Sequence, residues 1–317
     1  MVNISSISNI IGTLKNPRYA MMRICQSLFS HILSDKTYLK LIYYARFGRT
    51  LNLMAPESFN EKLNWLKLYD RKDNYTVMAD KYAVKAYVSN IIGSEYVVEN
   101  YGVFDKWDDI DFSKLPESFV IKGTHDSGGA FVCKRKDTFD FNSTRRQIEK
   151  NLNKNYFYDL REWPYKNIPP RIIVDRFLDD HTGKELRDYK FWCFGGEPQF
   201  MYCTIKGQNI YENFYDMDFK AIFINHNFPR HKPEFETPRN FDLMRELATK
   251  LSKNIPFVRV DFFDVDNHVY FGEFTFYDWG GMRPFKDGWD KKLGSLIDLS
   301  QLKENENTTD NDKLSYA

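Results

Sequence analysis

Two apolar segments near the C-terminal end, residues 258–263 and 272–275, constrain the fold most strongly, because each carries one acidic residue. Both segments are rich in β-branched and aromatic residues at close to a two-residue period, which is typical of strands, and the polar turn 264–267 joins them. The acids are Asp261 and Glu273. Burying a carboxylate in such a strand costs free energy unless it is paired or binds a metal ion.

The short turn predicts that Asp261 and Glu273 lie on one face of two antiparallel strands. Two carboxylates in a dry groove suit Mg²⁺, which takes oxygen ligands and completes its coordination with water and substrate phosphates. The alternative is a pair of structural acids, each satisfied by a neighbouring arginine or backbone amide. These two residues alone leave both interpretations open.

Length and charge bound the class of protein. A chain of 317 residues is long enough for one large domain or two closely packed ones. Its 45 Lys and Arg balance 44 Asp and Glu, so the net charge does not favour nucleic acid as a partner. Neither the four cysteines nor the six histidines have the spacing of a zinc site. With no signal peptide and no long apolar run, we expect the chain in the reduced cytoplasm.

The two ends of the chain are predicted to differ. Residues 17–55 are predicted to be helical, with one apolar stripe at Met21, Ile24, Leu28 and Phe29 and another at Leu39, Ile42 and Tyr43. We favour packing of both stripes on the chain's own domain. Because Arg18 and Arg23 flank the first stripe, peripheral association with the inner face of the membrane is the alternative. Residues 301–317 are polar and predicted to be disordered.

Residues 118–134 have the pattern of a strand, a glycine-rich loop and a second strand. Lys122 interrupts the first strand at the mouth of the loop, which runs from Gly123 to Gly129. No helix follows and no Gly-Lys-Ser/Thr is present, so this is not a Walker loop. A flexible loop between antiparallel strands can still close over phosphates with its backbone amides.

Caps and turns predict further elements. Helices are predicted from the capping box Ser58-Phe59-Asn60-Glu61, from Asp80 to Gly93, over 143–152, and from Thr237 with Pro238 in the first position. Strands are predicted at 96–98, 171–177 and 219–224, and a hairpin of 188–194 and 199–205 is turned by Gly195-Gly196.

Five motifs, in this order along the chain, resemble the TupA-like ATP-grasp proteins linked to teichuronopeptide and capsular polysaccharide synthesis. They are Ser58-Phe59-Asn60-Glu61-Lys62-Leu63, Ala79-Asp80-Lys81-Tyr82-Ala83-Val84, Phe119-Val120-Ile121-Lys122, Asp188-Tyr189-Lys190-Phe191 and Phe271-Gly272-Glu273-Phe274-Thr275. The resemblance covers roughly residues 37–299. It implies an α+β ATP-grasp fold, in which two lobes with antiparallel sheets clamp ATP, preceded here by a helical N-terminal region.

The resemblance also implies a division of the chain. Residues 1–104 are expected to form the helical N-terminal region with the first lysine segment, 105–178 the central lobe with the glycine-rich loop, 179–300 the C-terminal lobe with the metal site, and 301–317 the tail. One departure from the wider superfamily is that its usual Rossmann-like N-terminal lobe is not evident in the helical residues 1–70.

Roles for single residues follow from the same resemblance. Lys81, Lys122 and the amides of His125, Ser127, Gly128 and Gly129 are implied to bind the phosphates of ATP. Asp175 and the segment after it are implied to form the adenine hinge, with Glu185 on the ribose hydroxyls. Asp261, Glu273 and Thr275 are implied to hold Mg²⁺, although the superfamily usually has Asn at the last position. Arg259, Lys190 and Arg283 are the implied catalytic residues, with Arg283 as a carboxylate clamp in the loop 279–283.

Plain structural roles compete with several of these assignments. Lys81 could be a solvated helix lysine, and Lys190 could pair with Asp188 rather than reach a phosphate. For the His125 side chain we favour closing the turn over donating to phosphate. The strand position of Lys122 at the mouth of a glycine loop favours a functional role.

The implied activity is that of a carboxylate–amine ligase acting through an acyl phosphate. The implied substrates are a carboxylate-bearing glycan, or its sugar-nucleotide or lipid-linked precursor, and an amine or amino acid; a uronic acid would supply the carboxylate. A kinase on the same fold, phosphorylating a sugar hydroxyl, is the first alternative. A metal-dependent glycosyltransferase is the second, because Asp264-Val265-Asp266 has the Asp-x-Asp form, although these acids also suit a turn. A polysaccharide-binding protein is the third, favoured only by 27 Phe and 20 Tyr. The sequence does not determine the oligomeric state.

Overall fold

Two antiparallel β-sheets dominate the computed structural model, which describes residues 17–179, 186–205, 211–226, 228–232, 234–300 and 302. The larger sheet has the strand order β10-β9-β5-β6-β7-β8 and the smaller one β1-β4-β2-β3. The strands are β1 (Asn100–Phe104), β2 (Phe119–Gly123), β3 (Phe131–Cys133), β4 (Ile172–Arg176), β5 (Asp188–Phe194), β6 (Glu197–Ile205), β7 (Tyr211–Tyr215), β8 (Ala221–Ile222), β9 (Phe257–Val265) and β10 (His268–Thr275). The helices are α2 (Pro17–Ile24), α3 (Asp35–Phe47), α4 (Phe59–Tyr69), α5 (Asp73–Ala79), α6 (Ala83–Ile92), α7 (Phe141–Leu152), α8 (Phe157–Leu160), α9 (Phe241–Ser252) and α10 (Trp289–Gly294).

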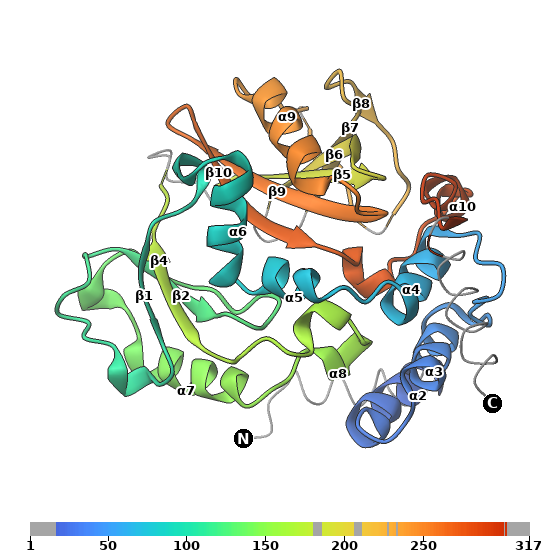
Figure 1. Cartoon of the computed structure of the whole chain (residues 1–317), viewed down its shortest axis with the longest axis horizontal. Helices are drawn as coiled ribbons and strands as arrows, with labels where there is room; N and C mark the ends of the chain where they lie inside the picture. The colour runs from blue at the N-terminus through green and yellow to red at the C-terminus, as the bar shows by residue number, and fades with distance from the viewer. Residues whose placement is uncertain are drawn as a thin grey trace, which may run out of the picture.

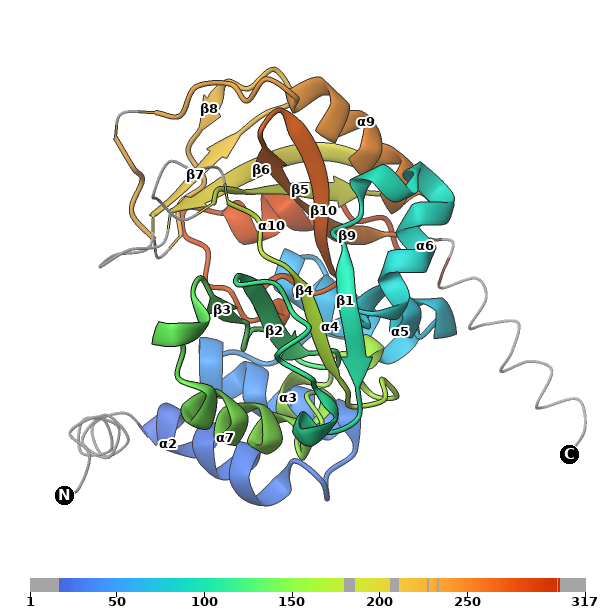
Figure 2. The same cartoon turned by 90° about the vertical axis from the view of Figure 1, so that its left-hand side faces the viewer.

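The two sheets lie between two helices in both views (Figures 1 and 2). Helix α9 packs on β5, β6 and β9 at the top of the molecule, and α7 packs on β2 at the bottom. The opposite faces of the two sheets are turned toward each other, and α4 covers part of the inner face of the larger sheet, where Phe59 stacks on Trp192 with 5.2 Å between the ring centroids. The predicted α+β class with a helical N-terminal region is confirmed.

Strand β9 shows why the larger sheet has one apolar and one charged face. Val258, Val260 and Phe262 are fully buried in the core that includes α9. The alternate residues Arg259 and Asp261 point to the opposite face, because successive side chains of a strand point to opposite sides. The charged face is the one turned toward the smaller sheet.

The smaller sheet repeats this pattern around a second core. Its buried face consists of Phe119 and Ile121 of β2 with Ile172 and Val174 of β4, and it packs on Ile148 of α7. The other face of β2 and β4 carries Lys122 and Asp175. Each sheet therefore covers one apolar face with a helix, and part of its other face presents charged side chains to the space between the sheets.

Several local predictions are confirmed. The Ser58 side chain accepts from the Glu61 amide, and the Glu61 carboxylate accepts from the Ser58 amide, which completes the capping box of α4. Gly195-Gly196 turns the β5–β6 hairpin with positive φ at both residues. The glycine-rich loop joins the antiparallel strands β2 and β3.

Other local predictions are wrong. Helix α9 begins at Phe241, and Asn240 rather than Thr237 occupies the N-cap. The strand predicted at 219–224 is reduced to the two residues of β8, and residues 94–96 form a 3₁₀ turn. Strand β7 was missed because its sequence Tyr-Glu-Asn-Phe-Tyr places Glu212 and Asn213 inside the protein, where the pattern gave no strand signal.

The first apolar stripe does not pack as we favoured. Met21 and Met22 contact the core and Cys25 is buried, but Ile24, Leu28 and Phe29 are exposed. Residues 25–29 form a π-helical turn, which has more residues per turn than an α-helix and so changes which side chains share a face. The second stripe is confirmed, because Leu39, Ile42 and Tyr43 are buried. None of the helices in the described ranges is both long and apolar enough to cross a bilayer.

Some predictions are not tested by the structure. Glu185 and, of the predicted tail, residues 301 and 303–317 lie outside the described residues. The division of the chain at residues 104 and 178 stays a prediction, and β1, which ends at residue 104, pairs with β4 of the smaller sheet.

Candidate functional site

A row of charged side chains crosses the inner face of the larger sheet. Glu273 on β10 is the cross-strand partner of Asp261 on β9, and Asp261 is in turn the partner of Lys190 on β5. Gly272 forms a bulge that shifts the register by one residue and brings Glu273 opposite Asp261. The predicted sharing of one face by the two acids is therefore observed.

Asp261 is a buried carboxylate held by two cations. Arg259 donates through Nε and Nη2 to the two carboxylate oxygens, each at 2.7 Å, and Lys190 Nζ donates to Oδ2 at 2.6 Å. Burial alone would raise the pKa of Asp261, but the charges of Arg259 and Lys190 outweigh it and lower that pKa. Lys190 also pairs with Asp188 at 3.1 Å, which is the structural alternative to a phosphate contact.

Arg259 is the centre of this network. Besides Asp261 it contacts Glu273 at 3.1 Å and Asp278 at 3.0 Å, and it donates to the Tyr202 hydroxyl at 3.2 Å. Asp278 is fully buried, so it needs these cationic partners. The guanidinium is thereby fixed in place on the inner face of the sheet, beside the more exposed Glu273.

Arg283 does not face an open site in this structure. Its side chain is 2% exposed, and its terminal nitrogens contact Asp278 at 3.1 Å and the buried Glu212. Its guanidinium also lies 5.5 Å from the Trp279 ring. The predicted role as a clamp for a substrate carboxylate gains no support from this placement, because carboxylates of the protein already occupy the guanidinium.

Helix α4 holds the loop 279–283, which ends at Arg283. Lys67 Nζ donates to the Gly280 carbonyl at 2.6 Å, and the Asn64 side chain donates to the Gly281 carbonyl at 2.9 Å. Trp279 has a positive φ of 52°, a conformation that costs free energy for a bulky residue. Its ring is nevertheless half-exposed, 5.2 Å from Phe228. The structure thus fixes an exposed tryptophan directly after Asp278, which is a partner of Arg259.

On the smaller sheet, Asp175 is shared by two lysines. Lys122 Nζ lies 3.0 Å from one carboxylate oxygen and Lys85 Nζ lies 3.0 Å from the other. The Asn100 side chain also donates to Asp175 at 3.1 Å. Burial would raise the pKa of Asp175, but the two lysines lower it. Asp175 is therefore an internal partner of the lysines rather than an open hinge residue.

Lys85 is a functional candidate that the sequence analysis missed. It lies on α6, four residues after Lys81, which is in the turn that precedes this helix, and both lysines pair with acids near the site. Burial lowers its pKa, and Asp175 only partly offsets this effect. The spacing of the two lysines was the signal that could have identified it.

Lys81 ties the glycine-rich loop to the site. Its ammonium contacts the Asp126 carboxylate at 3.0 Å and also donates to the Asp126 carbonyl. Burial lowers the pKa of Lys81 by more than the charges of Asp126 and Glu273 raise it, so the pKa is lowered. Because this lysine interacts with both the loop and Glu273, it lies between the two sheets and is not a solvated helix lysine.

The tip of the loop is open while its base is closed. Ser127, Gly128 and Gly129 are exposed, and the two glycines have positive φ values of 92° and 72°. The His125 side chain is buried, and its Nε2 lies 3.0 Å from the Asn151 carbonyl. This placement agrees with a histidine that closes the turn and leaves the amides of the tip accessible.

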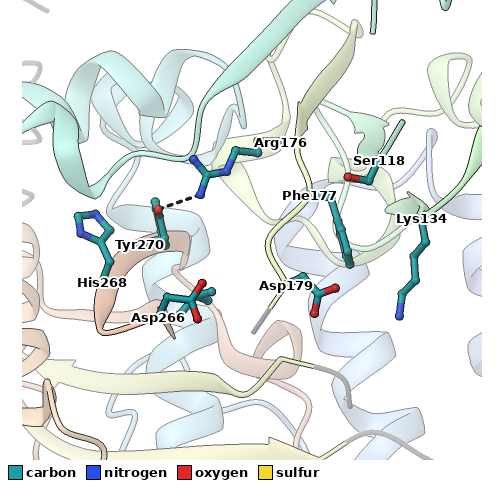
Figure 3. A pocket seen from close by; sticks show the side chains of 9 residues that line it. Ser118, Lys134, Arg176, Phe177, Asp179, Asp266, His268 and Tyr270 are labelled. Carbon is teal, nitrogen blue, oxygen red and sulfur yellow. Dashed lines mark hydrogen bonds between the residues drawn. The ribbon is translucent and has the colours of Figure 1, made fainter. Parts of the chain in front are cut away.

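A pocket of about 460 Å³ lies between the smaller sheet and the β9–β10 hairpin (Figure 3). It is lined by Ser118 and Lys134 from the smaller sheet, by Arg176, Phe177 and Asp179 after β4, and by Val265, Asp266, His268 and Tyr270 from the β9–β10 hairpin. Arg176 donates to the Tyr270 hydroxyl at 3.1 Å across the opening. The segment after Asp175, predicted as a hinge, therefore forms one wall of a real pocket.

On each of its two walls, the pocket is connected to the charged residues by a few positions along one strand. Ser118 precedes Lys122 by four residues, about 13 Å at the rise of a strand, and Tyr270 precedes Glu273 by three residues, about 10 Å. An elongated ligand could therefore occupy the pocket at one end and reach Lys122 and Glu273 at the other.

The two acids of the hairpin fit Mg²⁺ when a phosphate supplies further ligands. Glu273 is 46% exposed, and its carboxylate accepts from Arg259 and, at 3.4 Å, from Thr275 Oγ1. Asp261 Oδ2 accepts from both Arg259 and Lys190, whereas Oδ1 accepts only from Arg259 and keeps a lone pair for a metal ion. In the described parts of the chain, no three acids, histidines or cysteines converge as a complete metal site.

The Asp-x-Asp segment has structural roles. Asp264 accepts from the Asn240 side chain at 2.9 Å, and Asp266 has a positive φ of 50° in the hairpin turn. Asp and Asn tolerate this conformation better than most residues. The turn interpretation thus accounts for both acids.

Comparison with known proteins identifies similar sequences and structures. A family model described as TupA-like ATPgrasp matches residues 61–298, which is more than half of the chain. A search of curated proteins finds no match. Among solved structures, D-alanine-D-alanine ligase from Helicobacter pylori is 15% identical with a TM-score of 0.37, covering 72% of this chain and 64% of that chain. L-amino acid ligase from Bacillus licheniformis is 10% identical with a TM-score of 0.43, covering 78% and 56%. The ATP-grasp ligase PsnB, complexed with a minimal precursor, is 10% identical with a TM-score of 0.41, covering 88% and 74%. The chain spans less than two thirds of the first two, and likenesses at these TM-scores carry no further inference.

Proposed function

The chain belongs to the TupA-like ATP-grasp family, and we propose that it is an ATP-dependent ligase that joins a carboxylate to an amine. The observation that carries the proposal is the pair of facing charged surfaces. Lys81, Lys85 and Lys122 lie on one side, and Arg259 with Glu273 lies on the other. This arrangement suits a triphosphate, whose charge needs cations on several sides and a metal ion on the acids.

We place the nucleotide along the axis from the pocket to the cluster. The adenine would lie in the pocket near Phe177 and Tyr270, and the phosphates would extend toward Lys122 (Figure 3). The exposed amides of the loop tip at Ser127–Gly129 would cover the phosphates from above. Lys85 and Lys122 would then divide their charge between Asp175 and the ligand.

Mg²⁺, when bound by Glu273 and Asp261, would supply positive charge to the transferring phosphoryl group. Residues of this chain would provide the other contacts to the phosphoryl group. Arg259 is anchored by Asp278 and would hold its guanidinium fixed beside the phosphoryl group. Lys190, which donates to Asp261 on the same face, would exchange this contact for one with phosphate.

The reaction itself would take place in two steps. An oxygen of the substrate carboxylate attacks the γ-phosphorus, the bond to ADP breaks, and an acyl phosphate forms. The amine nitrogen then attacks the acyl carbon, inorganic phosphate leaves, and the nitrogen loses a proton as the amide forms. The fixed cations stabilise the negative charge that accumulates on the phosphoryl oxygens in both steps.

For the acceptor we propose a uronic acid of a surface polysaccharide or of its precursor, with an amine or an amino acid as the second substrate. The exposed Trp279 in the loop 279–283 lies on the expected acceptor side, next to the charged row. Arg283 would keep this loop in place through Asp278 and Glu212. Arg283 would thus position the loop 279–283 and would not bind the substrate carboxylate.

The test is amine-dependent turnover of ATP. The purified chain is incubated with Mg²⁺, ATP and a panel of uronic-acid glycans, with and without a panel of amines and amino acids. Release of ADP and phosphate that requires both a carboxylate and an amine, with an amide product in the mass spectrum, supports the ligase. ADP release with a phosphorylated sugar and no need for an amine would instead identify a kinase.

A further inference from the structure

The helices α2 and α3 carry a surface whose chemistry is unlike that of the rest of the chain. They lie at the lower edge of the molecule in both views, on the side away from α9 (Figures 1 and 2). Four large apolar side chains are exposed there: Ile24 (49%), Leu28 (62%), Phe29 (39%) and Ile32 (75%). Single exposed apolar residues are normal, but four within nine consecutive residues indicate an interaction surface.

The same segment is strongly basic. Residues 17–50 contain six Lys and Arg and one acid, whereas the whole chain has a net charge of only +1. That one acid, Asp35, is neutralised from within by ion pairs with Arg71 and Arg161, both at 2.7 Å. Arg23, Lys36 and Lys40 are exposed and have no ion-pair partner in the described part of the chain. Arg49 pairs with Asp290 at 2.7 Å, so the positive charge that this surface directs to solvent is that of Arg23, Lys36 and Lys40.

The sequence that precedes α2 continues this character. Residues 1–16 contain Ile4, Ile7, Ile10, Ile11 and Leu14, one lysine and no acid. An apolar and basic segment of about fifty residues at one end of a nearly neutral chain is a marked asymmetry of charge.

We propose that α2, the π-helical turn at 25–29 and α3 form a docking surface for an anionic lipid bilayer. Ile24, Leu28 and Ile32 would enter the boundary between headgroups and acyl chains, while Lys36 and Lys40 contact the lipid phosphates. A second protein is the less suitable occupant, because the centres of protein interfaces are depleted in lysine. The π-helical turn contributes by turning Ile24 and Leu28 outward. This inference goes beyond the proposed reaction and does not depend on it.

The experiment is vesicle flotation with the full chain. Vesicles of phosphatidylcholine with phosphatidylglycerol should carry the protein at low salt, vesicles of phosphatidylcholine alone should carry much less, and added salt should reduce the binding. The variant Leu28→Ser/Ile32→Ser should bind at least tenfold more weakly. Lys36→Glu/Lys40→Glu should also bind at least tenfold more weakly, since each lysine near an anionic surface contributes about fivefold.

Matched controls come from exposed residues outside this surface. Phe223→Ser removes an apolar side chain that is 59% exposed, and Lys232→Glu/Lys253→Glu makes the same change of charge on exposed lysines. Both controls should float like the wild type, and thermal melts should show that all variants fold. The proposal is overturned if the wild type fails to float at low salt, or if the controls lose as much binding as the test variants. It is also overturned if the chain dimerises without lipid in sedimentation velocity and Leu28→Ser/Ile32→Ser abolishes the dimer, because a second copy then covers the surface. Nucleotide binding by these variants reports separately on the proposed ligase site.

Discussion

Glu273 lies directly opposite Asp261 across the β9–β10 hairpin because Gly272 bulges out of the strand ladder. Without the bulge, Gly272 itself would face Asp261 and the Glu273 side chain would point to the apolar face. A Cβ atom at Gly272 would lie 3.1 Å from the Asp261 carbonyl oxygen and 3.2 Å from the Phe263 ring. The close approach of the two strands at the bulge thus depends on the absence of a side chain.

Replacing Gly272 with alanine tests this dependence. The new methyl group should push the strands apart, lower the free energy of unfolding by about 1–3 kcal/mol and weaken the stabilisation that Mg²⁺–ATP confers. Val269→Ala is the control, because Val269 is buried on the core side of the same strand. It should lower stability but keep nucleotide binding, and equal losses of binding in the two variants would contradict a local role for the bulge.

Glu273→Gln separates metal binding from architecture. The substitution keeps the shape and removes a charge that is 46% exposed, so without ligand the free energy of unfolding should change by less than about 1 kcal/mol. ATP turnover should be lost. In thermal melts with Mg²⁺–ATP at a hundred times its dissociation constant, the wild type should gain about 2.7 kcal/mol of stability. The variant should gain much less. Glu246→Gln, at an exposed position of α9, is the matched control. A variant that melts far below wild type without ligand would make Glu273 a structural residue.

Lys122→Ala and Lys85→Ala should each weaken ATP binding. Removing one charge-assisted contact costs about 1.5–3 kcal/mol, or roughly ten- to a hundredfold in affinity. Isothermal titration with Mg²⁺–ATP measures the effect, and Lys253→Ala, an exposed lysine after α9, is the control. Unchanged affinity in both test variants would mean that these lysines serve only to neutralise Asp175.

The pH dependence of stability tests the Asp175 network. Its pKa in the folded chain is lowered, so the carboxylate stabilises the fold above its unfolded pKa of about 3.9, and this contribution is lost as pH falls through the folded value. Asp175→Asn should therefore lower the free energy of unfolding by about 1–3 kcal/mol at pH 7. In urea titrations the difference from wild type should shrink at pH 3. A difference that is the same at both pH values, or larger in acid, would show that charge is not the cause.

Much of the site could be predicted from the sequence because local patterns determine it. Alternation in β9 predicted that Arg259 and Asp261 share a face, and the short polar turn predicted an antiparallel partner strand, whereas the pairing of Asp261 with Glu273 also needs the bulge at Gly272. Lys122 could be placed by the glycine loop that follows it. These predictions depend on neighbours within a few residues, and the family match supports the fold to which they led.

The features that could not be predicted depend on contacts between residues that are distant in sequence. Lys85 and Asp175 are ninety residues apart, and nothing near either residue indicates that they form an ion pair. The burial of Arg283 between Asp278 and Glu212 depends on β7, whose polar sequence hid it. The outward turn of Ile24 and Leu28 depends on a π-helical turn that a regular helical period does not predict.

A crystal structure of the chain with Mg²⁺ and a non-hydrolysable ATP analogue tests the central claim most directly. The adenine should lie in the pocket near Phe177 and Tyr270, and the triphosphate should extend to Lys122 with a metal ion at Glu273. The Lys190–Asp261 contact of 2.6 Å should lengthen as these groups take new partners. An analogue bound anywhere outside the space between the two sheets would contradict the account.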